Sequence, residues 1–228
     1  MFYNSYYFVL VIIPLLVGMW AQHKVNSTYQ QYSRVTCGNG LTGRQAARRI
    51  LDQNGLTNVQ IEQVRGNLTD HYDPKNNVVR LSEGVYNSHS VAAVGVAAHE
   101  CGHAVQYATG YVPMKIRGAI VPITNFGSKL AVPLVLIGLL FSWYPLAWIG
   151  LIGYALIALF QLITLPVEFN ASNRAIAVLS DMSMTEAEQR GVKKVLSAAA
   201  MTYVAALISA VTQLLHMIII VGGKNRRR

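Results

Sequence analysis

The chain has 228 residues, of which 53% are hydrophobic and only 13% are charged. Soluble domains carry about 25% charged residues, and disordered chains combine low hydrophobicity with high charge. The composition therefore excludes intrinsic disorder and disfavours an ordinary soluble domain. Because the apolar residues collect in four stretches, we expect a membrane protein of one or two domains.

The net charge and the number of cysteines restrict the class of protein further. The formal net charge is +9, but no segment interleaves basic with aromatic residues, and many basic residues lie near the apolar stretches. We therefore predict no nucleic-acid partner and a role for these charges in membrane orientation. Cys37 and Cys101 are too few for a disulfide scaffold, which favours a reducing compartment.

The first apolar stretch runs from Tyr6 to Ala21. No Lys or Arg precedes it and no A-x-A-like cleavage site follows it, so we predict an uncleaved transmembrane anchor rather than a signal peptide. Because proline removes a helix hydrogen bond, we expect the anchor to be bent or broken near Pro14.

The other three stretches predict a transmembrane hairpin and a fourth span. The apolar run from Ala119 to Val167 is too long for one crossing, since about 20 residues span the hydrocarbon core. We expect it to fold back at Ser142–Pro145. The fourth stretch, Tyr203 to Val221, is interrupted by Gln213 and His216.

Two polar regions, Gln22–Gly118 and Glu168–Thr202, hold 14 of the 19 basic residues. Two crossings separate these regions, so they face the same side, and the positive-inside rule places that side in the cytoplasm. The basic tail from Lys224 to Arg228 conflicts with four full spans. Either the tail is translocated against the rule, or one stretch does not cross completely.

A small fold is predicted inside the first polar region. Thr42 can cap a helix that Gly55 closes. Asn58–Arg65 and Val78–Leu81 have strand patterns, and the turn residues Asp73–Asn77 connect the last strand to the residues before them. These pieces predict a two- or three-stranded sheet.

The metal-binding motif follows this sheet. Residues 99–103 read H-E-C-G-H, and we expect them on a helix that Ser90 caps and Gly110 ends. Residues four apart share a helix face, so the imidazoles of His99 and His103 can bind one ion. Glu100 would then act as a general base on a metal-activated water. The expected ion is zinc, one per chain.

The residues around the H-E-C-G-H motif restrict the alternatives to a zinc site. The flanks of the motif are small and apolar, and buried His and Glu side chains are costly unless an ion or hydrogen bonds compensate them. A pair of hydrogen-bonded core histidines is the competing interpretation. Thr109 occupies the position of the third histidine of a metzincin, so a downstream Glu is expected as third ligand. Cys101 is predicted to be an inert buried thiol.

Five phrases occur in order between about Ser33 and Ala206: GLTGRQAARRIL, LTDHYDP, VRLSEGVY, VAAHECGHAVQ and PVEFNASNRA. In this combination they resemble the YugP-like bacterial membrane zinc metallopeptidases, with a broader similarity to the HtpX-type and CAAX-processing membrane proteases. The resemblance implies a multi-pass protein of the bacterial plasma membrane. We expect a mainly α-helical fold with a gluzincin-like catalytic helix pair and a small β-sheet on the cytoplasmic side.

The resemblance also implies the third zinc ligand. The related proteases place a zinc-binding Glu in an E-x-x-A-D sequence on a later helix, and the matching residues here are Glu168 to Ser172. Ser172 stands where the family has Asp, which would remove the carboxylate that orients a ligand histidine. Asn173 is the expected substitute.

The remaining downstream acids have simpler explanations. Asp181 fits a turn, and Glu186 and Glu188 fit the first turn of a helix, where they face the positive end of its dipole. Glu168 directly follows a 22-residue apolar span, where a carboxylate is unfavourable unless it is neutralised. An interfacial Glu paired with Arg174 is the alternative to a zinc ligand.

Three further residues are candidates for contacts with the substrate or the transition state. His71 or Tyr72 would donate a hydrogen bond to the oxyanion, and the competing interpretation of these residues is an ordinary Asp-Pro turn with a packed Tyr. Arg174 would neutralise charge beside Glu168, or would simply be a solvated interfacial arginine.

The predicted function is a membrane-embedded zinc endopeptidase that hydrolyses membrane or membrane-proximal proteins, with Glu100 as the catalytic base. The extended substrate would pair with an edge strand such as Val78–Leu81. A non-peptidase zinc hydrolase of lipid or small amides is one alternative, and a non-enzymatic zinc-containing membrane scaffold is another. The expected partners are a peptide or membrane-protein substrate and the lipid bilayer.

The predicted organisation has five segments. They are the N-terminal anchor (1–21), a cytoplasmic catalytic region (22–118), a transmembrane hairpin (119–167), cytoplasmic helices with the third ligand (168–202), and a fourth transmembrane helix with the basic tail (203–228).

Overall fold

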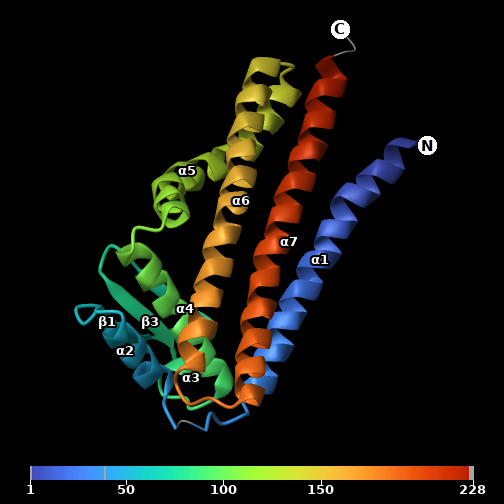
Figure 1. Ribbon diagram of the computed structural model, residues 1–228. Coiled ribbons are helices and arrows are strands. Elements are labelled where there is room, and N and C mark those ends of the chain that lie inside the picture. The colour runs from blue at the N-terminus through green and yellow to red at the C-terminus, as the bar shows by residue number, and fades with distance from the viewer. Residues whose placement is uncertain (1, 39, 226–228) are drawn as a thin grey trace. The chain divides into compact units, whose positions relative to one another are not determined.

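The computed structural model describes residues 2–38 and 40–225, with side chains between residues 8 and 223. Within these residues it is mainly helical, as predicted, and includes a small sheet (Figure 1). The end of the predicted basic tail, residues 226–228, lies outside the described residues. The elements in chain order are α1 (Phe2–Tyr32), α2 (Gly43–Gln53), β1 (Gln60–Val64), β2 (His71–Asp73), β3 (Val78–Ser82), α3 (Glu83–Tyr86), α4 (Val91–Ala108), α5 (Val112–Leu140), α6 (Tyr144–Ser180) and α7 (Glu186–Asn225).

The chain forms two compact units. One, which we call the mixed unit, comprises Gln22–Met114 and Pro166–Met201 and contains the sheet. The other, the helical unit, is built from Lys115–Leu165 and from the parts of α1 and α7 that lie nearer the ends of the chain. The long helices α1, α6 and α7 each contribute to both units.

Within the part of the chain that the structure describes, four helices contain a segment long and apolar enough to cross a membrane: Phe8–Tyr32, Val112–Leu140, Tyr144–Ser180 and Glu186–Gly223. In the helical unit many large apolar side chains of these helices are exposed, among them Phe126 at 70% and Leu140 at 77%. Large exposed apolar surfaces of this kind are typical of contact with lipid or with another protein.

The structure contains the four predicted apolar helices, but their bounds are wider than the predicted spans. The chain turns at Phe141–Trp143, where Ser142 has a φ of 56°, and α6 begins at Tyr144. Of the two alternatives predicted near Pro14, a bend or a break, the break is wrong, because α1 is continuous through this residue and extends to Tyr32. A single proline leaves the hydrogen bonds of the neighbouring turns intact, and the residues after Ala21 include no glycine or proline that would end the helix.

Local signals set the boundaries of α2 and α4 in the mixed unit. Thr42 and Gln45 form a capping box at the start of α2, and Gly55 follows its end with a φ of +71°. At α4 the Ser90 side chain accepts a hydrogen bond from the backbone N–H of Ala93. Buried side chains of α2, α4, α6, α7 and the sheet form the core of this unit.

Among the described residues, the sheet has three strands in the order β1-β3-β2. β1 pairs with β3 in parallel, with Ile61 opposite Val79, whereas β2 is antiparallel and places Tyr72 opposite Val79. The turn predicted from Asp73 to Asn77 connects β2 and β3. The prediction that Val78–Leu81 is an edge strand is wrong, because these residues form the central strand; four of the five residues of β3 are buried.

The helices α4 and α6 approach each other closely in the mixed unit. A Cβ atom added at Gly102 would lie 2.7 Å from the carbonyl oxygen of Ala171. Glycine at this position, within the H-E-C-G-H sequence of α4, therefore allows the two backbones to come together.

Candidate metal centre

Three predicted ligand residues converge in the mixed unit. The Nε2 atom of His99 lies 3.3 Å from Oε2 of Glu168, and the Nε2 atom of His103 lies 3.5 Å from the same oxygen. The two imidazole rings are edge to face, with centroids 4.7 Å apart. One ligand atom from each of the three side chains lies within 4.8 Å of the other two. The two histidines lie on α4 and Glu168 lies on α6, at least 65 residues further along the chain.

The donor set and its spacing fit a zinc ion. Two imidazole nitrogens and one carboxylate are a common catalytic zinc set, which leaves a fourth position open. Zinc–ligand distances of about 2.0–2.2 Å place neighbouring tetrahedral ligands roughly 3.3–3.6 Å apart, and the two Nε2–Oε2 separations lie in this range. Both are longer than the usual N–H···O hydrogen bond, about 2.7–3.2 Å.

The other ring nitrogen of each histidine has its own partner. Nδ1 of His99 and Oγ of Ser172 form a hydrogen bond of 3.2 Å, and Nδ1 of His103 lies 3.0 Å from Oε1 of Gln106. These contacts direct both Nε2 atoms toward Glu168. The expectation that Asn173 orients a ligand histidine is wrong, because its side chain is exposed while Ser172 makes the contact itself.

Glu100 is buried next to the three donors. Burial raises the pKa of its carboxyl group, the imidazoles of His99 and His103 lower it, and the charges of Asp70 and Glu168 raise it. A carboxylate with a raised pKa is better suited to accept a proton near neutral pH.

The protonation of His103 follows from its surroundings as well. Burial alone would lower the pKa of this histidine, but the hydrogen bond with Glu168 and the charge of Glu100 outweigh it and raise the pKa. The negative groups around His103 therefore favour a positive charge at this position, which a proton or a metal ion can supply.

Asp70 was not identified from the sequence as a separate site residue. It precedes β2 and accepts hydrogen bonds from the backbone N–H of Ser82 at 2.7 Å and from its hydroxyl at 2.9 Å. Burial raises the pKa of Asp70, whereas these bonds lower it. Only the folded sheet brings Asp70 near Glu100.

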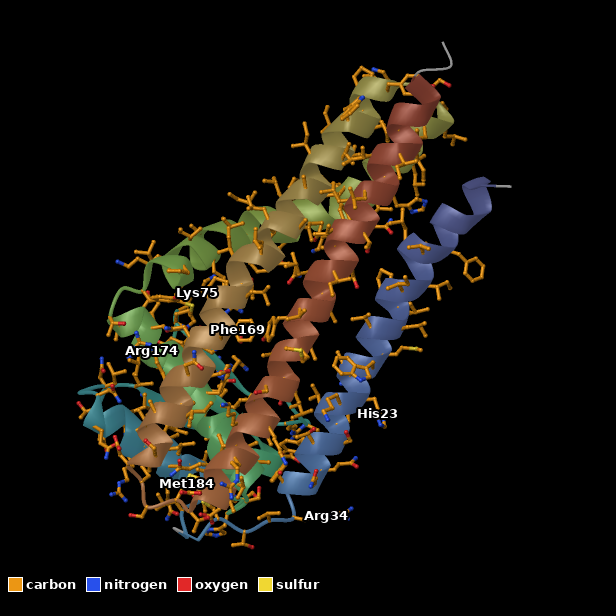
Figure 2. All side chains as sticks on the ribbon, turned by 45° about the vertical axis from the view of Figure 1, so that its right-hand side comes forward. His23, Arg34, Lys75, Phe169, Arg174 and Met184 are labelled. Carbon is orange, nitrogen blue, oxygen red and sulfur yellow. The ribbon has the colours of Figure 1, made fainter. Side chains whose placement is uncertain are left out.

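The other candidate contact residues occupy different surroundings. His71 is exposed on β2, and its Nδ1 lies 2.8 Å from the carbonyl oxygen of Thr69. Tyr72 is buried and donates its hydroxyl hydrogen to Oδ1 of Asn77. The Nε group of Arg174, which lies on α6 (Figure 2), donates to Oδ1 of Asn170.

Cys101 is buried, and its Sγ lies 3.5 Å from the carbonyl oxygen of Ala47. Burial raises the pKa of this thiol. The side chain is therefore a protonated thiol at neutral pH, in agreement with the inert role predicted for it.

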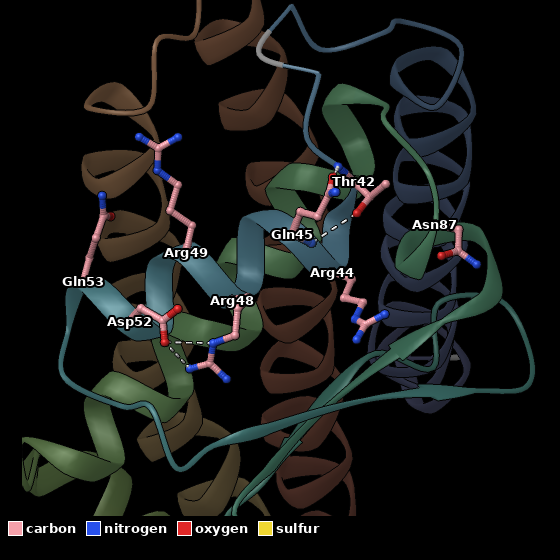
Figure 3. Close-up of a pocket in the computed structure, with 8 residues that line it drawn as sticks. All are labelled: Thr42, Arg44, Gln45, Arg48, Arg49, Asp52, Gln53 and Asn87. Carbon is pink, nitrogen blue, oxygen red and sulfur yellow. Dashed lines mark hydrogen bonds and ion pairs between the residues drawn. The ribbon is translucent and has the colours of Figure 1, made fainter.

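The mixed unit also has a surface hollow of about 700 Å³ along α2 (Figure 3). Arg48 and Asp52 form an ion pair there, with Nη2 and Oδ1 2.8 Å apart. None of the described residues that line this hollow belongs to the three-donor cluster, so it is separate from the candidate metal centre.

Comparisons with known proteins agree with this chemistry. Residues 7–222 match the family described as "Putative neutral zinc metallopeptidase". The "Putative membrane protease YugP" of Bacillus subtilis (strain 168) is 49% identical over 212 residues, which cover 92% of this chain and 94% of that protein. No solved structure matches the chain. The chain therefore belongs to this family of neutral zinc metallopeptidases, which confirms the resemblance noted in its sequence.

Proposed function

We propose that this member of the neutral zinc metallopeptidase family is a membrane-embedded endopeptidase that hydrolyses membrane or membrane-proximal proteins. One observation carries the proposal. The Nε2 atoms of His99 and His103 converge on Oε2 of Glu168, at 3.3 and 3.5 Å, next to the buried carboxyl group of Glu100.

His99, His103 and Glu168 would hold one zinc ion per chain, which is the gluzincin arrangement of two histidines from H-E-x-x-H and a glutamate from a later helix. When bound, zinc would lower the pKa of a coordinated water and polarise the carbonyl group of the substrate. The donor chemistry and spacing of the three side chains support this assignment.

Glu100 is the proposed general base. It takes a proton from the attacking water and passes this proton to the amine nitrogen that leaves when the peptide bond breaks. Its position between the two histidines in sequence, its burial and its raised pKa support this role.

An extended substrate would add a strand to the sheet at β2. β2 is an edge strand and contacts α4, whereas β3 is enclosed between its neighbours. Backbone hydrogen bonds to an edge strand bind a peptide with little dependence on its side chains. Exposed His71 on β2 would be close to such a substrate.

The proposed location is the bacterial plasma membrane, with the mixed unit in the cytoplasm. Four apolar helices and the identity with a membrane protease support a multi-pass protein. The concentration of basic residues in the two polar regions supports the cytoplasmic side.

The test is the cleavage of a purified membrane-protein substrate in detergent or liposomes. Wild type should cleave it and a zinc chelator should abolish cleavage. Glu100→Gln should retain zinc but lose at least about 10²–10⁴-fold in rate, because it lacks the base. Glu186→Gln is the matched control, since Glu186 is exposed and pairs with Arg190; it should behave as wild type.

Equal turnover by Glu100→Gln and wild type would refute the proposed mechanism. Hydrolysis of amide-containing lipids without any cleavage of protein would support a lipid or small-amide hydrolase instead. Zinc binding without hydrolysis of either substrate would support a non-enzymatic scaffold.

A further inference from the structure

A buried amide next to the candidate metal centre is held by three hydrogen bonds. Gln106 of α4 has no exposed surface. Its Oε1 lies 3.0 Å from Nδ1 of His103, and its Nε2 donates to the carbonyl oxygen of Val167 at 2.8 Å and to Oδ1 of Asn170 at 3.0 Å. An amide buried this deeply is tolerated because its polar atoms have partners.

The contact with Val167 fixes which way the amide points. A backbone carbonyl can only accept a hydrogen bond, so the NH₂ group of Gln106 must face Val167. The carbonyl Oε1 of Gln106 must then face His103. Because Oε1 is an acceptor only, Nδ1 of His103 must carry the proton and donate it.

This orientation leaves Nε2 as the ring nitrogen of His103 that can bind a metal ion. In a neutral imidazole with its proton on Nδ1, the lone pair is on Nε2. Nε2 of His103 faces Oε2 of Glu168 at 3.5 Å. A cation between these two atoms, either a proton on Nε2 or a metal ion, makes their contact favourable, and a zinc ion bound here would use the Nε2 lone pair of the tautomer that carries its proton on Nδ1.

We propose that Gln106 is the positioning residue of the zinc ligand His103: it accepts the Nδ1 proton, selects the tautomer that binds metal through Nε2, and holds the ring toward Glu168. The inference rests on the proposed zinc site. Gln106 takes the place that a carboxylate occupies beside the ligand histidine of many zinc sites. It provides the acceptor without adding a negative charge to a centre that already contains Glu100 and Glu168.

Gln106 also connects the two helices that carry the ligands. Its NH₂ group reaches Val167 and Asn170, on either side of Glu168 in α6. Asn170 accepts a further hydrogen bond from Nε of Arg174. A purely structural role for Gln106 would consist of this link alone, so the experiment must separate the link from the acceptor.

Two substitutions of Gln106 separate its role as the acceptor for His103 from its role as a link between α4 and α6. Gln106→Met keeps the approximate size but removes both the acceptor and the NH₂ group. Gln106→Glu keeps an acceptor for His103 but lacks the NH₂ group that reaches Val167. Asn170→Ala is the third variant, because it weakens the link between the helices while the acceptor of Gln106 remains.

The readout is the zinc dissociation constant of the purified full-length proteins, measured by competition with a chelator, together with the thermal midpoint of the zinc-free proteins. Gln106→Met should bind zinc about 10- to 100-fold more weakly than wild type, the loss typical when the partner of a ligand histidine is removed. Gln106→Glu and Asn170→Ala should retain affinity close to that of wild type, even if their thermal midpoints fall.

Wild-type affinity in Gln106→Met would overturn the positioning role. Equal losses of affinity in Gln106→Met and Asn170→Ala would also overturn it and leave only the structural link, and this comparison holds even if Gln106→Glu does not fold. Glu168→Gln tests the zinc site separately from the positioning role of Gln106. Failure of wild type to bind zinc, or full zinc retention by Glu168→Gln, would refute the proposed zinc site itself.

Discussion

Replacing Gly102 by alanine tests whether the close packing of α4 on α6 sets the geometry of the metal centre. In an ordinary helix this change is stabilising by roughly 0.5–1 kcal/mol, because glycine loses more backbone entropy on folding. Here the new Cβ would lie 2.7 Å from the carbonyl oxygen of Ala171, whereas ordinary van der Waals contact begins at 3.4 Å. The obstacle is backbone, which cannot rotate away as a side chain can.

The size of the effect follows from these distances. The difference, 3.4 minus 2.7 Å, requires a local separation of up to about 0.7 Å between α4 and α6. Overpacking typically costs about 1–3 kcal/mol, which exceeds the gain in helix propensity. A catalytic or metal site tolerates displacements of about 0.5 Å, and a displacement near 1 Å can cost about 10²-fold. We therefore expect zinc binding to weaken about 10- to 100-fold.

The assay combines the zinc dissociation constant with the thermal midpoint in one detergent. Gly102→Ala should lower the midpoint, by about 2–4 °C for each kcal/mol lost in a chain of this size. Gly95→Ala is the control on the same helix, because its Cβ would meet the end of the Val192 side chain at 3.1 Å, and this side chain can shift. It should retain zinc. Wild-type zinc affinity together with a raised midpoint in Gly102→Ala would refute the reasoning.

Two further predictions concern topology and acid stability. Single cysteines introduced at Asp52 and at Glu186 should be labelled from the same side of the membrane and one at Trp143 from the other; labelling of the first two from opposite sides would contradict the hairpin and the shared location of the ligands. Hydrogen bonds from the Asn76 side chain, the Arg80 guanidinium and the backbone N–H groups of Asn76 and Lys75 lower the pKa of Asp73. Because the folded pKa lies below the unfolded value of about 3.9, the ionised carboxylate stabilises the fold at neutral pH and this contribution is lost as the pH falls below about 4. Asp73→Asn should therefore have a lower thermal midpoint than wild type at pH 7, and the difference should shrink between pH 4 and pH 2; a difference independent of pH would contradict the assignment.

The sequence alone was sufficient for features that depend on nearby residues. Thr42 can cap only the helix that follows it, and Gly55 ends this helix because glycine readily adopts the positive φ required there. The pairing of His99 with His103 needs only the helical repeat. A turn was expected at Ser142–Pro145 because an apolar run of this length exceeds the thickness of a bilayer, and the observed turn overlaps this prediction at Ser142 and Trp143.

Features that depend on contacts between distant segments required the tertiary structure. Val78–Leu81 has the same strand pattern whether it lies at the edge or the centre of the sheet, and only the parallel pairing with β1 makes it central. The short Ser172 side chain can reach His99 because α6 packs closely on α4 through Gly102, so no carboxylate or Asn173 is needed at this point.

Gln106 illustrates the same limit at the metal centre. It lies three residues after His103, so helix geometry places the two side chains on neighbouring positions. Its role nevertheless depends on the carbonyl group of Val167, 61 residues away in the chain, because that acceptor fixes the orientation of the amide. The residue types of the metal centre were readable from the sequence, whereas the directions of their hydrogen bonds were decided by the packing of α4 against α6.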